Sequence, residues 1–366
     1  MTINPETLTH VLSKMLGKPI RRADYHTQEL QGGTLGDVYL VTGMAEDAAG
    51  AQLPYQVVWK TQMQWERPGD SPSWRREYDL YMSDFDAVCT HAFRWPVCYH
   101  GELGDTEMEL WMEYVQGPSG SDLTIDMLEQ AAMAIGRFQG RLHKQPPAAL
   151  QQNTALGDVG FMAREFAQWH TQSFTYEFLI SPESRWPDFL KRMLKNGDIC
   201  FYEGKSIEYG CLRSPACDLP AHLQRMLTDI DDRWEAIFEA LQRLPTVLCH
   251  RDYWIENIFI ADNNVVAIDW DGAGWGFLGE DIASLIVDDT DAAHLGAYYR
   301  KLIPAYHKGL SEYMDISGIG DFHVRDMMLV KFGYRILQHY MFTQSAEIKQ
   351  QQIEILQAIH ELADGG

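Results

Sequence analysis

The chain has 366 residues and is acidic, with 52 Asp and Glu residues against 30 Lys and Arg residues and a formal net charge of −22. This length is sufficient for two lobes or domains, because a single hydrophobic core rarely extends beyond ~250–300 residues. Nucleic acid and anionic lipid are disfavoured as partners, because both are bound through clusters of Lys and Arg. An acidic surface attracts a cationic small molecule, but it is also common in proteins that are simply soluble.

The cysteines and the apolar segments indicate the compartment. The six cysteines are scattered and show no Cys-x-x-Cys spacing, which fits reduced thiols best. Cys211 and Cys217 flank a proline and are candidates for a bridge or a metal site, although no paired His or Cys neighbour supports either. No uncharged apolar run reaches the ~18 residues of a membrane span, and the N-terminus lacks an apolar signal core. We therefore expect a soluble, cytoplasmic monomer or homodimer.

The first part of the chain reads as a helix followed by strands. Apolar residues at helical spacing predict a helix over residues 4–16. A glycine-rich turn then separates predicted strands at 27–30 and 38–41. Its glycines are Gly32, Gly33 and Gly36. Glycines allow backbone amides to approach phosphate oxygens, so these residues are candidate phosphate-binding groups, although an ordinary hairpin would look the same.

The next strand leads into Lys60, whose ammonium would lie at a strand end. Such a compact charge suits the α and β phosphates of a nucleotide, whereas an exposed lysine on a strand would have no such role. A helix predicted over residues 73–85 carries Glu77, which is a candidate partner for Lys60. Arg75 and Arg76 compete for the same carboxylate.

Further strands and then helices follow. Strands predicted at 94–101 and 108–115 would complete a small antiparallel sheet, and the linker-like run 117–121 marks a domain boundary after residue 116. The remaining part reads as mainly helical, with helices predicted at 126–142, 292–306, 325–342 and 345–362. Arg335 and Gln338 lie one turn apart on one of these helices and face either a cleft or the surface.

The stretch from His250 to Asp271 concentrates polar side chains around a predicted hairpin. Its strands, Ile258–Ile260 and Val265–Ile268, are joined by a turn sequence of Ala, Asp and Asn. Asp252, Asn257 and Asp269 flank this hairpin, so their oxygen atoms are expected to converge. Magnesium prefers oxygen ligands and is commonly held by one or two protein groups together with phosphate oxygens.

The pattern His-x-Asp-x-x-x-x-Asn, followed by a strand that ends in Asp, is the phosphoryl-transfer signature of kinases. Here the sequence resembles the aminoglycoside phosphotransferase and choline-kinase-like family of small-molecule kinases. The resemblance implies an α+β, protein-kinase-like fold with two lobes. Residues 1–116 would form the N-lobe, a small antiparallel β-sheet with a helix. Residues 117–366 would form a larger, mainly helical C-lobe.

The resemblance also implies roles for individual residues, with ATP and Mg²⁺ as cofactors. Asp252 would be the catalytic base, and Asn257 and Asp269 would be the metal ligands that complete the catalytic set. Asp271 would be an additional ligand. Backbone groups of the segment from Glu113 to Val115 would hydrogen-bond the adenine edge.

Only ten residues separate Asp269 from the helix that opens at Glu280, which leaves no room for the long activation segment of protein kinases. We therefore expect a small-molecule acceptor rather than a protein substrate. A catalytically silent nucleotide-binding regulator remains an alternative, although every charged position that the chemistry needs is present. Asp281 is either a brace for the catalytic loop, as the resemblance implies, or an ordinary acid at a helix N-terminus.

The acceptor is the least defined part of this interpretation. Residues 157–244 exceed what a minimal kinase lobe needs and are expected to form or cover the acceptor pocket, with the stretch 196–219 as a lid or a surface loop. Trp254, Trp275 and the acidic pair Asp288 and Asp289 suit a cationic or hydroxylated molecule. Helix-surface positions for the two acids are the alternative.

Overall fold

A computed structural model describes residues 3–30, 36–65, 67, 70, 73–83, 87–89, 92–151, 154–171, 174–184, 186–215, 217–288, 290–320 and 323–362. The contacts of the chain divide it into two compact units. The first consists of Met1–Leu123, Gln145–Gly157 and Glu256–Ala273, and the second of Thr124–Lys144, Asp158–Ile255 and Gly274–Gly366. The predicted boundary after residue 116 stays a prediction. The segment Glu256–Ala273 belongs to the first unit although it lies late in the chain.

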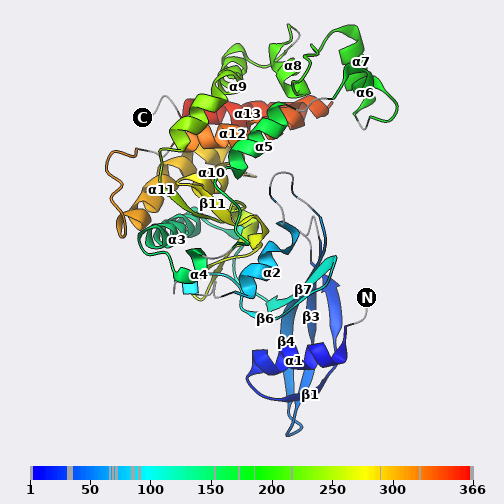
Figure 1. Ribbon diagram of the computed structural model, residues 1–366, viewed down its shortest axis with the longest axis vertical. Helices are drawn as coiled ribbons and strands as arrows, with labels where there is room; N and C mark the ends of the chain where they lie inside the picture. The colour runs from blue at the N-terminus through cyan, green and yellow to red at the C-terminus, as the bar shows by residue number, and fades with distance from the viewer. Residues whose placement is uncertain are drawn as a thin grey trace. The chain divides into compact units, whose positions relative to one another are not determined.

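An antiparallel sheet forms most of the first unit. Its strands follow the order β1-β3-β4-β7-β6, and β2 pairs with β3. The strands are β1 (Ile20–Ala23), β2 (His26–Glu29), β3 (Gly36–Asp47), β4 (Gln52–Met63), β6 (Cys98–Leu103) and β7 (Glu107–Glu113). Helix α1 (Pro5–Leu16) buries Leu8 and Val11 in the same apolar cluster as Val41 of the sheet, as its periodicity predicts. Figure 1 shows α1 lying across the long strands β3 and β4.

Strands β3 and β4 are longer than the sequence pattern predicts. They pair continuously from Gly36 opposite Gln62 to Glu46 opposite Gln52. Residues near the far end have turn composition, but pairing satisfies their backbone groups and extends both strands. Lys60 consequently lies within β4, opposite Val38, and not at a strand end as predicted.

The strand predicted over residues 94–101 is divided in two. Strand β5 (Phe93–Arg94) ends before Pro96, because proline has no N–H to contribute to a ladder. The chain re-enters the main sheet as β6. Strand β5 instead pairs in parallel with β10 (Asn264–Ala267), through Phe93 and Val265.

The predicted hairpin is present. Strand β10 pairs antiparallel with β9 (Ile258–Ala261), in the register of Ala267 opposite Ile258. The two residues between the strands, Asp262 and Asn263, have φ angles of 51° and 61°. This left-handed conformation is the one that a tight hairpin turn requires, and Asn and Asp tolerate it.

The helix predicted over residues 73–85 is shorter than expected. It begins as a 3₁₀ turn, η1 (Ser73–Arg75), and continues as α2 (Arg76–Tyr81). Residues 84–86 lie outside the described residues. Glu77, the candidate partner of Lys60, lies on α2 and is buried in the first unit.

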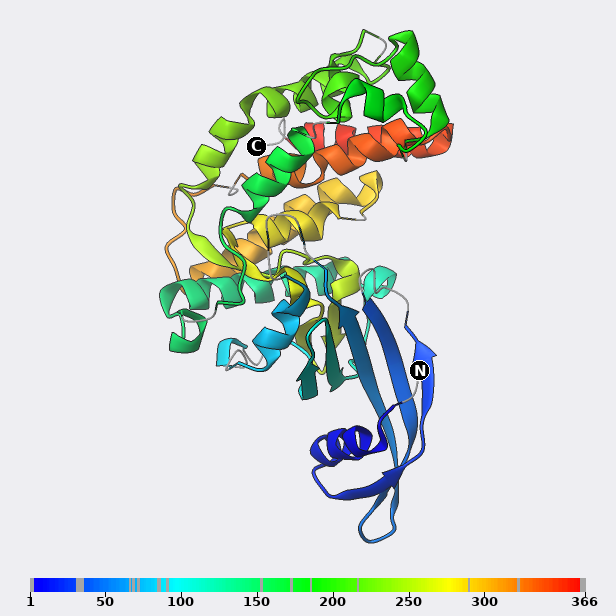
Figure 2. The same ribbon diagram turned by 45° about the vertical axis from the view of Figure 1, so that its right-hand side comes forward.

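Helices form most of the second unit, as predicted, and Figure 2 shows α12 and α13 side by side. They are α3 (Ile125–Lys144), α5 (Phe161–His170), α6 (Tyr176–Ile180), α7 (Asp188–Asn196), α8 (Ile207–Arg213), α9 (Ala221–Leu241), α10 (Glu280–Val287), α11 (Ala292–Ser311), α12 (Val324–Phe342) and α13 (Ala346–Glu361). Helices α3 and α11 meet through glycines. A Cβ atom at Gly136 would lie 2.4 Å from the Tyr306 carbonyl oxygen, so the two backbones approach more closely than a side chain would permit.

Helix α8 occupies the middle of the stretch 196–219. Its residues Ile207, Glu208 and Leu212 are buried, so this part of the stretch packs into the helical unit. Strands β8 (Thr246–Cys249) and β11 (Gly274–Phe277) pair as a short two-stranded sheet. In the chain they precede and follow the stretch from His250 to Asp271. Strand β11 has no counterpart among the predicted elements.

All six cysteines are free thiols. Over the described ranges, no helix combines the length and apolar character that crossing a bilayer requires.

Candidate active site

A buried ammonium group lies between two carboxylates in the first unit. Lys60 Nζ donates one hydrogen bond to Glu77 Oε2 and another to Asp269 Oδ1, each at 2.6 Å. Lys60 is 9% exposed and Glu77 is 1% exposed. Strand β4, helix α2 and the chain after β10 thus bring together three of the residues that the sequence singled out.

Two opposing effects set the charge of Lys60. Burial lowers the pKa of its ammonium, but the carboxylates of Asp269 and Glu77 raise it by more, so the pKa lies above its ordinary value. The ammonium therefore stays charged at neutral pH. A charged, oriented ammonium is the group that a nucleotide phosphate would meet.

A third carboxylate, Asp271, belongs to the same cluster. It lies on the 3₁₀ turn η5 (Trp270–Gly272), is 7% exposed, and has Arg67 Nη2 at 3.2 Å from its Oδ2. Burial raises the pKa of Asp271 to about 6, and the charge of Asp269 adds to this effect. The cluster holds more carboxylates than cations, so a bound cation would lower its electrostatic energy.

Asn257 and Asp269 flank the β9–β10 hairpin. The N–H of Ile268 donates to the carbonyl oxygen of Asn257 at 3.0 Å, so both candidate ligands leave the same end of the hairpin. Asp269 has a φ of 63°, a left-handed conformation that is uncommon outside glycine and that clusters at functional sites. The metal site at this end of the hairpin stays a prediction.

The donor set fits magnesium that is bound together with phosphate oxygens. Asn257 offers an amide oxygen, and Asp269 and Asp271 offer carboxylate oxygens, which are the hard donors that this ion prefers. Within the described ranges, no cluster of three or more His, Cys, Asp and Glu side chains forms a metal site by itself. At nucleotide sites, magnesium is usually held by one or two carboxylates together with phosphate oxygens and water.

Arg76 has a role that the sequence did not reveal. Its guanidinium is 1% exposed, forms two hydrogen bonds of 2.7 Å with the carboxylate of Asp70, and donates to the carbonyl oxygen of Asp271 at 2.8 Å. Arg75 pairs with Asp79 on its own helix. Both arginines are thus paired elsewhere, which leaves Lys60 as the partner of Glu77, and Arg76 fixes the backbone of the third carboxylate.

The glycine turn is described only in part. Gly32 and Gly33 lie outside the described residues, so their phosphate contacts stay predictions. Gly36 begins β3, where a Cβ atom would lie 2.3 Å from the carbonyl oxygen of Thr61. The close approach of β3 and β4 therefore explains why glycine stands at this position.

Glu113 and Val115 lie at the end of β7 and just beyond it. The Glu113 carboxylate pairs with Arg94 at 2.7 Å, and its N–H donates to the carbonyl oxygen of Val97 at 2.8 Å. Val115 is 7% exposed and packs beside Ala261. Because the Glu113 N–H is used within the protein, the predicted adenine contact would fall on the Glu113 carbonyl or on the Val115 backbone.

In the second unit, a buried carboxylate braces the segment that carries Asp252. Asp281 on α10 is fully buried and accepts hydrogen bonds from the backbone N–H of His250 at 2.9 Å and of Arg251 at 2.7 Å. Gln139 on α3 donates to the same carboxylate at 2.8 Å. Asp281 is therefore a backbone brace, which decides between the two interpretations of this residue.

The residue before Asp252 is held from both sides. The guanidinium of Arg251 donates to the carbonyl oxygens of Asp158 at 2.6 Å and Trp275 at 2.7 Å. Its own backbone has a φ of 71°, and its carbonyl oxygen accepts a hydrogen bond of 2.5 Å from Lys331 Nζ on α12. A single lysine on an amphipathic helix carries no sequence signal, so Lys331 was not predicted.

The sequence comparisons agree with this geometry. Residues 203–315 match the model of the phosphotransferase enzyme family, and the matched segment contains Asp252, Asn257, Asp269 and Asp281. This segment of the chain is similar to the phosphotransferase enzyme family. No curated protein matches its sequence. The resemblance seen in the motifs is thereby confirmed at the level of the family.

Two solved structures with a TM-score above 0.5 show the fold of this chain. Choline kinase from Cryptosporidium parvum Iowa II has a TM-score of 0.51 at 12% identity, over 93% of this chain and 90% of that chain. The microcompartment-associated aminopropanol kinase has a TM-score of 0.51 at 14% identity, over 98% and 96%. A spectinomycin phosphotransferase in complex with ADP and spectinomycin has a TM-score of 0.49 at 14% identity, over 100% and 99%. The predicted protein-kinase-like fold is confirmed.

Secondary-structure elements occupy most of the stretch after Asp269. One residue separates the turn η5 from the strand β11, and two residues separate β11 from α10. Glu280 and Asp281, which open α10, are both buried. The ten residues between Asp269 and α10 leave no room for a long peptide-docking segment of the kind found in protein kinases.

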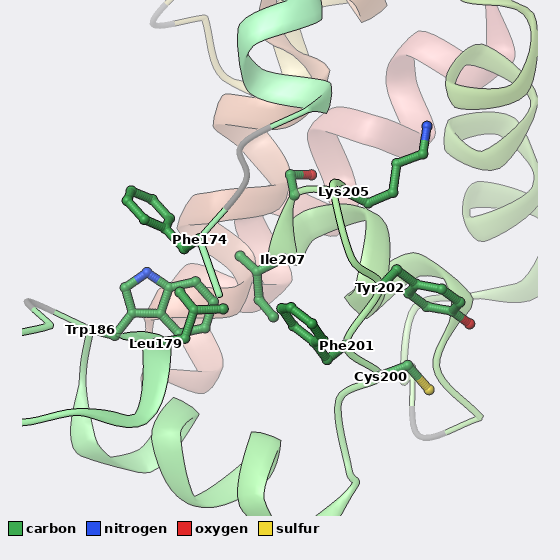
Figure 3. Close-up of a pocket in the computed structure, with 9 residues that line it drawn as sticks. Phe174, Leu179, Trp186, Cys200, Phe201, Tyr202, Lys205 and Ile207 are labelled. Carbon is green, nitrogen blue, oxygen red and sulfur yellow. The ribbon is translucent and has the colours of Figure 1, made fainter. Parts of the chain in front are cut away.

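An aromatic crevice in the helical unit is too narrow for a small-molecule ligand. Phe174, Trp186 and Phe201 line it, and its volume is about 10 Å³, which is room for one water molecule at most. Figure 3 shows the side chain of Lys205 directed away from Trp186. This crevice is therefore part of the packing of α6 to α8.

Proposed function

We propose that this protein is a phosphotransferase that transfers the γ-phosphate of ATP to a hydroxyl group of a small molecule. One observation carries the proposal, namely that Lys60 forms hydrogen bonds of 2.6 Å with both Glu77 and Asp269. A purely structural salt bridge needs one carboxylate. Two carboxylates around a single buried ammonium, with a third beside them, form a charge pattern that suits phosphates and a divalent cation.

In this proposal each charged side chain has one role. Lys60, oriented by Glu77, contacts the α and β phosphates. Asn257 and Asp269 hold Mg²⁺, with Asp271 as an additional ligand. When bound, the ion would offset the negative charge on the phosphate oxygens.

Asp252 acts on the acceptor. Its carboxylate orients the hydroxyl and accepts the hydroxyl proton as the new oxygen–phosphorus bond forms and the bond between the γ-phosphorus and the bridging oxygen breaks. ADP leaves with that bridging oxygen. Because the transition state is loose, positioning of the hydroxyl contributes more than a strong base would. The brace from Asp281 supplies that positioning for the backbone next to Asp252.

The experiment separates binding from chemistry. Titration of a fluorescent ATP analogue with and without Mg²⁺ should show metal-dependent affinity in the wild type, and Asp269→Asn should remove the metal dependence. ATP consumption across a panel of hydroxylated metabolites should be abolished in Asp252→Asn, whose nucleotide affinity stays close to that of the wild type. Asp229→Asn, an exposed acid on α9, is the matched control and should change neither result.

Metal-independent nucleotide affinity in the wild type would contradict the proposed metal site. Turnover in Asp252→Asn would contradict the base assignment. Metal-dependent ATP binding without turnover on any acceptor would favour the second candidate, a nucleotide-binding regulator. Phosphorylation of a protein in place of a small molecule would contradict the acceptor class.

A further inference from the structure

The second unit contains a hollow where the end of α10 faces α12 and α13. Its volume is about 330 Å³, at the lower end of the range for small-molecule pockets. Phe332 and Ile336 supply apolar wall, and Asp288, Thr290 and Arg335 supply polar groups. The mixture of an apolar wall with a few convergent polar groups is typical of a ligand site.

Arg335 is already positioned in this hollow. Its Nη1 donates to Asp288 Oδ1 at 2.8 Å, and its guanidinium carbon lies 5.9 Å from the centre of the Phe332 ring. The side chain is nevertheless 51% exposed. Asp288 is its hydrogen-bond partner among the described residues, so further N–H donors of the guanidinium are directed to ligand or solvent. A carboxylate is the anion that such a planar pair of donors binds best.

Thr290 provides a second sign of a missing partner. It is 6% exposed and lines the hollow, and its hydroxyl oxygen has no hydrogen-bond partner within the described part of the chain. A buried hydroxyl without a hydrogen-bond partner is less stable than a satisfied one. A polar ligand in the hollow would supply that partner.

Asp288 connects the hollow to the candidate base. It is 8% exposed, and burial raises the pKa of its carboxyl, which the charge of Arg335 lowers and that of Asp252 raises. Lys331, one turn before Arg335 on α12, donates a hydrogen bond to the carbonyl oxygen of Arg251, so α12 brings the hollow close to the segment that carries Asp252. Asp291 and Glu354 also line the hollow, so its acids outnumber its arginine and a purely anionic ligand is disfavoured.

We infer that this hollow binds the acceptor, and that the acceptor is a small hydroxylated zwitterion of the amino-acid class. Its carboxylate would take the remaining donors of Arg335, and its ammonium would lie against the acidic side of the hollow. Thr290 would complete the hydrogen bonding, with the ligand hydroxyl directed toward Asp252. This inference rests on the proposed function, because it names the substrate class of the same reaction.

The test uses pairs of compounds that differ only in the carboxylate. They are L-serine with ethanolamine, L-threonine with 1-amino-2-propanol, and L-homoserine with 3-amino-1-propanol. Calorimetric titration of the full chain should show at least one acid that binds tenfold or more tightly than its amine, and Arg335→Gln should reduce that ratio to near one. Arg233→Gln, which removes a comparable Arg–Asp pair on α9, should leave the ratio unchanged.

Thr290→Val keeps the shape of the side chain and should weaken binding of the same acid threefold or more, which provides a second test if Arg335→Gln folds poorly. Three results would overturn the inference: amines that bind as tightly as their acids, no binding of any acid in the panel, or an unchanged ratio in Arg335→Gln. If no acid is preferred over its amine but ATP binding stays metal-dependent, only the proposed acceptor class is rejected. Loss of ATP binding with intact binding of an acid rejects the proposed function instead.

Discussion

Replacement of Lys60 with Met would leave the carboxylates of Glu77 and Asp269 without the ammonium that separates them. Each of them is 2.6 Å from Lys60 Nζ, and the Glu77 side chain is 1% exposed. Removal of one partner of a buried ion pair costs about 3–5 kcal/mol, because the other charge stays buried and uncompensated. The Asp269 side chain is 36% exposed, so water screens part of its charge. We therefore expect Lys60→Met to lower the free energy of unfolding by about 3 kcal/mol at pH 7.

The pH dependence of this loss follows from Glu77. Burial raises the pKa of Glu77 in the wild type, and removal of the ammonium would raise it further. A carboxyl whose pKa is raised in the folded state binds its proton more tightly when folded, so acid favours folding and the penalty grows as the pH rises. The destabilisation should therefore be smaller at pH 5 than at pH 8. Adding Glu77→Gln to Lys60→Met should recover a large part of it.

The measurement is urea unfolding of the three chains, followed by tryptophan fluorescence at pH 5, 7 and 8. Lys349→Met is the control, because its partner Asp218 lies 3.6 Å away and both side chains are partly exposed. An exposed pair of this kind is worth no more than about 1 kcal/mol. A loss below about 1 kcal/mol in Lys60→Met, or no recovery in the double variant, would refute the argument that Glu77 depends on this ammonium.

Three further changes test other parts of the structure. Burial raises the pKa of Asp281 to about 6. The folded state therefore binds this proton more tightly, and the free energy of unfolding of the wild type should fall by about 3 kcal/mol between pH 4 and 7 through this group. In Asp281→Asn, urea unfolding should show no such fall with pH. Lys331→Met removes the hydrogen bond to the Arg251 carbonyl oxygen and should lower kcat by a larger factor than it changes the KM for ATP. Lys331→Arg should restore part of kcat. Equal changes in the two constants would contradict the positioning role. Gly309→Ala would place a Cβ atom 2.2 Å from the Met133 carbonyl oxygen. The free energy of unfolding should fall by about 1–3 kcal/mol, and the melting temperature should fall with it. An unchanged melting temperature would contradict the close contact between α3 and α11.

Local patterns were sufficient for helices α3, α11, α12 and α13 of the second unit and for the β9–β10 hairpin. The helix predicted over residues 325–342 is present as Val324–Phe342, because its apolar positions repeat at the helical period. The hairpin at Asp262 and Asn263 is present because these residues tolerate the left-handed turn. In both cases the information lies within a few residues of the element it specifies.

Local patterns failed where pairing joined distant segments. Strand β5 was predicted as part of the N-terminal sheet, but it pairs with β10 through Phe93 and Val265. Nothing near Phe93 in the sequence indicates that partner. The same holds for Arg335 on α12, whose ion-pair partner Asp288 directly follows α10. It also holds for Arg76, whose partner Asp70 lies in a segment without periodicity.

By itself, the sequence determined which chemical groups are present and in what order, because a kinase-type site needs particular oxygen donors at nearly constant local spacing. From this order alone came the family, the fold class and the candidates Lys60, Glu77, Asp252, Asn257 and Asp269. Only the tertiary structure decided which partners these groups take. Lys60 and Asp269 are 209 residues apart in the chain, and hydrogen bonds between such residues depend on how the chain folds and not on any pattern along it.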